Sequence, residues 1–148
     1  MDADFSSVWS RVTGVRPPED ELTRLRRWMG DETRELHACE ELLRGHLPAP
    51  VRDTLTAVLR VKRRDLKELQ TMYYLRTGDS WPQPKPEKRK RETLMNALRE
   101  RYAASMDMAD GYRGCASERR DLSSLCAELA ENEEANARKL RGLIKRLL

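Results

Sequence analysis

The sequence predicts an all-α protein, a single four-helix bundle built from 148 residues. Two observations predict this fold class. Leucine, which favours helices, occurs 20 times, whereas Val and Ile, which favour strands, together occur seven times. All seven prolines fall into three clusters, and the long segments between the clusters carry apolar residues at helical spacing.

The prolines and glycines divide the chain into a short leading segment and four long helices. Residues 1–16 hold at most one short amphipathic helix, with Phe5, Val8, Trp9 and Val12 on one face and Gly14 as its end. Residues 17–148 form the bundle, in which Pro18 and the acids after it start the first helix and Ser117 caps the fourth. The expected helices span residues 18–45, 51–76, 87–114 and 117–148.

The connections between these helices predict the topology. The first and last pairs are joined by short turns, whereas Thr77 to about Pro86 forms a longer loop that could run most of the length of a bundle. Short, long and short connections are typical of a bundle with one crossover. An up-and-down bundle with a loose central loop stays open as the alternative.

Each expected helix interrupts its apolar stripe with polar residues near mid-length. A lone charged residue on such a stripe usually reaches water with its long side chain. Polar positions at a similar depth on all four helices instead favour one shared polar cluster, because burying an unpaired charge is costly. The six positions are Glu32, Lys62, Asp65, Ser105, Glu133 and Asn136.

This spacing resembles the ferritin-like superfamily, and within it the rubrerythrin-like di-iron proteins. In that family helices 1 and 3 each supply one Glu to the iron site, and helices 2 and 4 each supply a Glu-x-x-His pair. The resemblance covers roughly residues 20–148. It assigns the single ligand positions to Glu32 on the first helix, seven residues before Cys39, and to Ser105 on the third helix, seven residues before Tyr112. It assigns the paired positions to Lys62 and Asp65 on the second helix, followed by Leu69, and to Glu133 and Asn136 on the fourth helix, followed by Leu140.

The ligand identities depart from the family at four of the six positions. Asp65 and Asn136 replace the two His residues, Lys62 replaces a bridging Glu, and Ser105 replaces another Glu. Two iron ions need several anionic ligands, and a lysine adds positive charge instead. We therefore expect no di-iron centre, no cofactor and no catalytic residue. The Lys62 ammonium is expected to pair with Glu32 and Glu133, in a non-catalytic structural or interaction protein.

A metal-binding reading is the alternative. Oxygen ligands from Glu32, Asp65, Glu133 and Asn136 would suit a single hard divalent cation such as Mg²⁺, Mn²⁺ or Ca²⁺. The resemblance also leaves open a rubrerythrin-like oxidoreductase or an iron-handling protein with an altered site. Lys62 weighs against all three, because it lies among the ligands and repels cations.

The remaining features concern partners and location. The basic segment Lys85–Arg91 is interpreted as the solvated start of a helix, since no aromatic residue interleaves with its charges for nucleic-acid stacking. Trp81, between the loop prolines, either contacts an unknown protein partner or packs back on the bundle. A homodimer is expected, because proteins of this resemblance often pair bundles side by side and because the apolar residues of the leading segment need a surface to pack on.

No apolar run is long enough to span a bilayer, and the acidic first residues do not resemble a signal peptide. A cytoplasmic protein is therefore expected. Its three cysteines, Cys39, Cys115 and Cys126, are too widely spaced for a zinc site and are interpreted as reduced, partly buried thiols.

Overall fold

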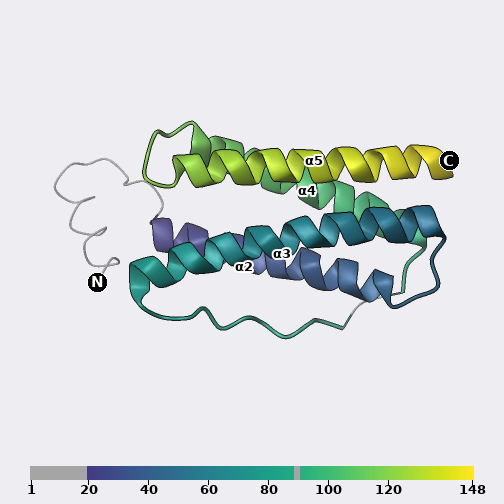
Figure 1. The fold of residues 1–148 in the computed structure, drawn as a ribbon, viewed down its shortest axis with the longest axis horizontal. Helices are drawn as coiled ribbons and strands as arrows, with labels where there is room; N and C mark the ends of the chain where they lie inside the picture. Colours follow the sequence, from purple (N-terminus) through teal and green to yellow (C-terminus); the bar gives the residue numbers. More distant parts are fainter. Residues whose placement is uncertain (1–19, 89–90) are drawn as a thin grey trace.

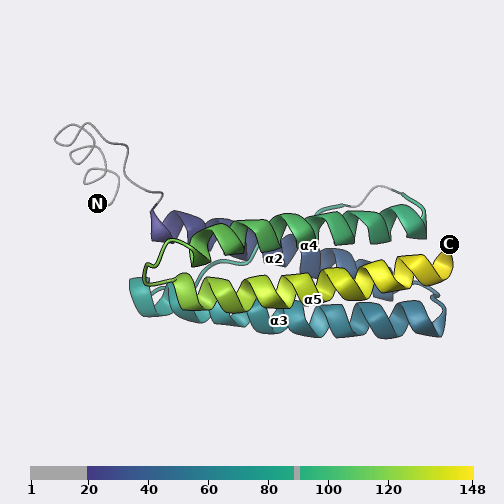
Figure 2. The same ribbon diagram turned by 90° about the horizontal axis from the view of Figure 1, so that it is seen from above.

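The fold is an all-α bundle, as predicted. The structure is a computed structural model that describes residues 20–88 and 91–148, and within them it contains four helices and no strand. The helices lie side by side along one axis (Figure 1, Figure 2). The expected short helix on residues 1–16 lies outside the described residues. The four helices are α2 (Glu21–Leu43), α3 (Ala49–Thr77), α4 (Leu94–Ala116) and α5 (Ser123–Leu147).

The topology contains one long crossover. Helices α2 and α3 form an antiparallel hairpin, and α4 and α5 form a second one (Figure 1). The segment after Gly78 runs back along the bundle, so that α3 and α4 point in the same direction (Figure 1, Figure 2). The short-long-short pattern is therefore confirmed. Across the bundle, α2 packs on α4 and α3 packs on α5, which leaves α2 and α5 on one diagonal.

Local chemistry accounts for the ends of the first two helices. The Asp20 side chain accepts a hydrogen bond from the Leu22 amide and caps α2. Helix α3 begins with Pro50 in its first turn, where the missing N–H costs nothing. It ends at Gly78, whose φ of 75° is a left-handed conformation that glycine adopts without a steric penalty.

The expected start of the third helix at residue 87 is wrong. Helix α4 begins at Leu94, because Thr93 caps it with a hydrogen bond from the Asn96 amide. Pro82–Lys88 is instead an exposed, non-helical part of the crossover. The basic residues in it are therefore solvated as expected, but on a loop rather than on a helix.

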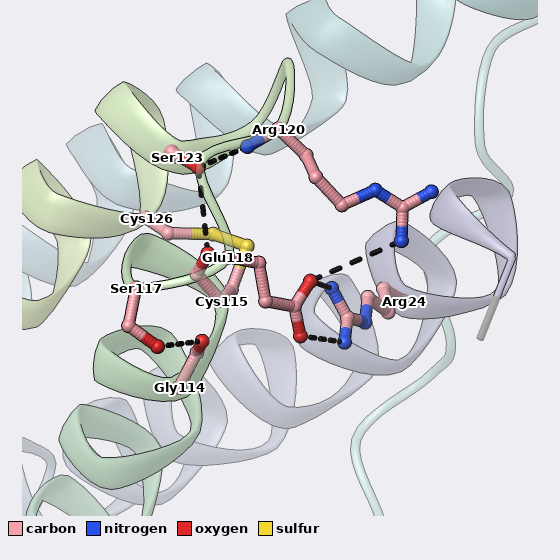
Figure 3. The surroundings of a disulfide bond; sticks show 8 residues. All are labelled: Arg24, Gly114, Cys115, Ser117, Glu118, Arg120, Ser123 and Cys126. Carbon is pink, nitrogen blue, oxygen red and sulfur yellow. Dashed lines mark hydrogen bonds and ion pairs between the residues drawn. A yellow bond between two sulfur atoms is a disulfide. The ribbon is translucent and has the colours of Figure 1, made fainter. Parts of the chain in front are cut away.

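The expected N-cap at Ser117 is also wrong, and so is the interpretation of two cysteines as free thiols. Ser117 follows the last turn of α4, where its hydroxyl donates to the Gly114 carbonyl (Figure 3). Helix α5 starts only at Ser123. A disulfide joins Cys115 to Cys126 across this turn, with Cα atoms 5.9 Å apart (Figure 3). Spacing alone could not reveal the pair, because the turn brings the two helix ends together.

The turn between α4 and α5 also holds the start of α2. The Glu118 carboxylate accepts two hydrogen bonds from the Arg24 guanidinium, at 2.7 and 2.6 Å (Figure 3). Ser123 accepts from the Arg120 amide at 2.7 Å and so orders the turn (Figure 3). This end of the bundle is thus fixed by one covalent bond within the second hairpin and one ion pair between the hairpins.

The core is a continuous apolar cluster along the bundle axis, to which all four helices contribute. Trp81 in the crossover is partly buried and packs against this cluster, so it lies back on the bundle. No helix in the described part of the chain has a stretch long and apolar enough to cross a bilayer. The core leucines are Leu25, Leu36, Leu55, Leu59, Leu66, Leu69, Leu98, Leu122, Leu129, Leu140 and Leu143.

Candidate functional site

All six polar positions singled out in the sequence are buried. Helix α3 carries two of them, α5 carries two, and α2 and α4 carry one each. The exposed fraction of each residue is at most 1%, far below what a charged side chain reaching water would show. Reach to the surface is therefore excluded for every member. We call the six the polar cluster: Glu32, Lys62, Asp65, Ser105, Glu133 and Asn136.

The centre of the polar cluster is an ion pair between α3 and α5. The Lys62 Nζ atom donates to both carboxylate oxygens of Glu133, and each distance is 3.2 Å. Both side chains are fully buried. The sequence predicted that Lys62 would pair with Glu133, and the structure confirms this half of the prediction.

The predicted contact of Lys62 with Glu32 takes another form. The Glu32 carboxylate accepts a hydrogen bond of 3.0 Å from the Tyr112 hydroxyl, which comes from α4. Glu32 acts on Lys62 through its charge rather than through an ion-pair contact. Tyr112 is itself fully buried and packs against Trp28, with ring centroids 5.3 Å apart. The tyrosine therefore links the polar cluster to the apolar core.

Asp65 lies beside this pair and is held by a residue that sequence reasoning missed. Its carboxylate accepts a hydrogen bond of 2.8 Å from the Asn132 side-chain amide, on α5. Asn132 directly precedes Glu133, so it falls outside the apolar stripe from which the six polar positions were predicted. The Glu-Asn-Glu-Glu run on α5 was the signal available for it, because it places a neutral amide among acids.

Burial and neighbouring charges shift the pKa values of three groups in the polar cluster. Burial disfavours the ammonium of Lys62, but the negative charges of Glu32 and Glu133 outweigh this and raise its pKa above the usual range. Burial raises the pKa of Glu32 well above its usual value, against the opposing effect of Lys62. Burial likewise raises the pKa of Asp65 to about 7. Lys62 is therefore charged near neutral pH, and the buried carboxyls of Glu32 and Asp65 take up protons more readily than exposed ones.

Several atoms of the polar cluster have no hydrogen-bond partner among the described residues. Unpaired buried polar groups are uncommon and cost roughly 1–3 kcal/mol each. These atoms mark a place where a proton, a water molecule or a ligand would be favourable. They are Glu32 Oε2, Asp65 Oδ2, Ser105 Oγ, Asn136 Oδ1 and Asn136 Nδ2.

The three carboxylates of the cluster are close enough to share one ion. One oxygen each from Glu32, Asp65 and Glu133 lies within 4.8 Å of the other two. This oxygen-rich donor set suits a hard divalent cation. It does not suit two iron ions, because the Lys62 ammonium holds both oxygens of Glu133 and no His stands at any of the six positions.

A second buried ion pair lies between α2 and α4 and was also missed. Arg101 Nε donates to Glu35 Oε1 at 2.7 Å, and both side chains are more than nine-tenths buried. A surface cavity of about 490 Å³ lies outside the polar cluster. It is lined by Arg101 and Thr33 together with the crossover residues Pro84–Lys88.

The third cysteine gives no reactive group. Cys39 on α2 carries a free thiol, as expected, but it is fully rather than partly buried. Burial raises the pKa of this thiol to about 11, so that it stays protonated near neutral pH.

No family model, curated protein or solved structure matches this chain.

Proposed function

We propose that this protein is a non-catalytic ferritin-like bundle in which a buried lysine has taken the place of a metal centre. One observation carries the proposal. The Lys62 ammonium is fully buried and contacts both oxygens of Glu133, with the carboxyls of Glu32 and Asp65 beside it. A fixed positive charge among acidic side chains meets the electrostatic need that a metal ion would otherwise meet.

The role that remains for such a bundle is to serve as a structural element or to bind another protein. Every ionisable group of the polar cluster is closed off from solvent, so no substrate can reach it without a large opening of the bundle. The cluster therefore supports a stable, uniquely packed scaffold rather than a reaction. We extend the proposal to a homodimer, for which sedimentation of the purified protein is the test.

The metal content of the native protein tests the central claim. Protein purified without chelator is expected to contain far less than one metal ion per chain by elemental analysis. The Lys62→Met variant is expected to gain affinity for Mn²⁺, because it leaves the three carboxylates without their cation. Lys67→Met, an exposed lysine on the same helix, is the matched control and is expected to gain none.

The second candidate function is binding of a single divalent cation. It is favoured by the close approach of the Glu32, Asp65 and Glu133 oxygens and by the unpaired amide of Asn136. In that case the wild-type protein would contain one ion per chain, and Glu133→Gln would lose it. A stoichiometric metal in the wild-type protein would therefore replace the first proposal with this one.

The cytoplasmic location predicted from the sequence stays a proposal with its own test. The Cys115–Cys126 disulfide is of a kind that persists mainly in oxidising compartments. Acid quenching of intact cells, followed by alkylation of the unfolded protein, is expected to label both buried cysteines if the protein is cytoplasmic. Protection of both cysteines would place it elsewhere.

A further inference from the structure

The last turn of α3 exposes two neighbouring large apolar side chains. Tyr74 is 56% exposed and Leu75 is 72% exposed, although the adjacent Tyr73 is buried. Exposed apolar pairs of this size are favourable places for another apolar surface to pack. Tyr74 and Leu75 together are called the α3-end patch below.

The described chain begins beside this patch. Glu21, the first residue of α2, forms an ion pair with Arg76, the residue that directly follows the patch on α3. Residues 1–19, which lie outside the described residues, therefore join the bundle at the same end. In the extended state residues 13–19 alone reach about 23 Å, more than the diameter of two packed helices.

The sequence of the leading segment offers a complementary apolar surface. Phe5, Val8, Trp9 and Val12 recur at the three- and four-residue steps that place side chains on one helical face. Two of them are aromatic, and aromatic side chains contribute large contact areas for few residues. These aromatic and aliphatic side chains are of the kind that packs on a patch of one tyrosine and one leucine.

The covalent connection favours this segment over any separate partner. A segment tethered by a short linker experiences an effective concentration in the millimolar range at its own binding surface. A second protein molecule would lose translational and rotational freedom that the tethered segment has already lost. A small patch such as this one suffices for the first case and is too small for a stable complex of two chains.

We propose that residues 5–12 dock on the α3-end patch of the same chain, through Phe5, Val8, Trp9 and Val12. The docked segment covers Tyr74 and Leu75. It is an interaction within the chain and is independent of whether the polar cluster holds a metal ion.

Limited trypsin digestion tests the proposal, because Arg11 lies inside the docking segment. Arg16 precedes Pro17 and is not a trypsin site, so Arg11 is the one usable site before the bundle. Leu75→Asp removes half of the patch without touching the core. Cleavage after Arg11 is expected to become at least about fivefold faster, because the segment spends more time undocked.

Two further variants make the result specific. Phe5→Ala, six residues away from the cleavage site, is expected to speed cleavage in the same way from the other side of the contact. Met106→Asp changes an exposed apolar residue on α4 and is expected to leave the rate unchanged. Equal cleavage rates in the wild type, Leu75→Asp and Phe5→Ala would overturn the proposal. Faster cleavage of the wild type on dilution would also overturn it, because a second copy would then be the occupant.

Discussion

The buried ion pair makes Lys62→Met the most informative single change in this protein. Methionine follows nearly the same path as the lysine side chain and leaves no large cavity, so the substitution chiefly removes the charge. In the variant, the Glu133 carboxylate loses its two contacts of 3.2 Å with the Lys62 ammonium and stays buried among other acids. Removing one partner of a buried ion pair typically costs about 3–5 kcal/mol. A domain of ordinary stability has about 5–15 kcal/mol in total.

Urea unfolding followed by circular dichroism measures this directly, with Lys67→Met as the exposed control. The double variant Lys62→Met/Glu133→Gln removes both charges and is expected to recover part of the loss. A free energy of unfolding for Lys62→Met within about 0.5 kcal/mol of the wild type at pH 7, the spread of an ordinary surface substitution, would refute the reasoning.

Three further predictions concern the surroundings of this pair. Burial raises the pKa of Asp65 to about 7 in the folded state, whereas the unfolded value is near 4, so the folded state holds the extra proton. The free energy of unfolding therefore falls by at most about 4 kcal/mol as the pH rises between these values. Asp65→Asn is expected to remove this slope in urea unfolding, whereas the exposed Asp53→Asn is expected to keep it. Tyr112→Phe leaves the Glu32 carboxyl without its donor and is expected to lower the unfolding free energy by about 1–3 kcal/mol at pH 7. Replacing Cys115 and Cys126 by Ala opens a closed loop with a sequence separation of 11 and is expected to lower the free energy of unfolding by about 3 kcal/mol. Dithiothreitol is expected to abolish this difference, because it reduces the disulfide of the wild type.

Helix existence and topology were predictable because proline and leucine act locally. Prolines are excluded from helix interiors, so one cluster marked the start of the first helix and the other two marked the first two connections, whereas the stripes marked which face is buried. Helix starts were harder. The start of α4 after Thr93, rather than at residue 87, depends on one capping hydrogen bond. The start of α5 at Ser123, rather than at Ser117, has no side-chain cap and depends on how the α4–α5 turn closes.

The polar cluster was predictable in membership and less so in its pairing. Polar residues on an apolar stripe must be buried together, which fixed all six positions from spacing alone. Which carboxylate the Lys62 ammonium contacts depends on distances across the bundle. The Glu32 carboxylate, expected to pair with Lys62, instead accepts a hydrogen bond from Tyr112. Asn132 and the Glu35–Arg101 pair lie beside the stripes, where periodicity carries no signal.

The buried polar contacts share a geometric property. Lys62 with Glu133, Asp65 with Asn132 and Glu32 with Tyr112 each join the α2–α3 hairpin to the α4–α5 hairpin, and none lies within one hairpin. The two hairpins are connected by a crossover whose segment Pro82–Lys88 is exposed. A chain cut within that segment would therefore keep every one of these contacts. The two fragments are complementary halves, each carrying the polar groups by which it recognises the other.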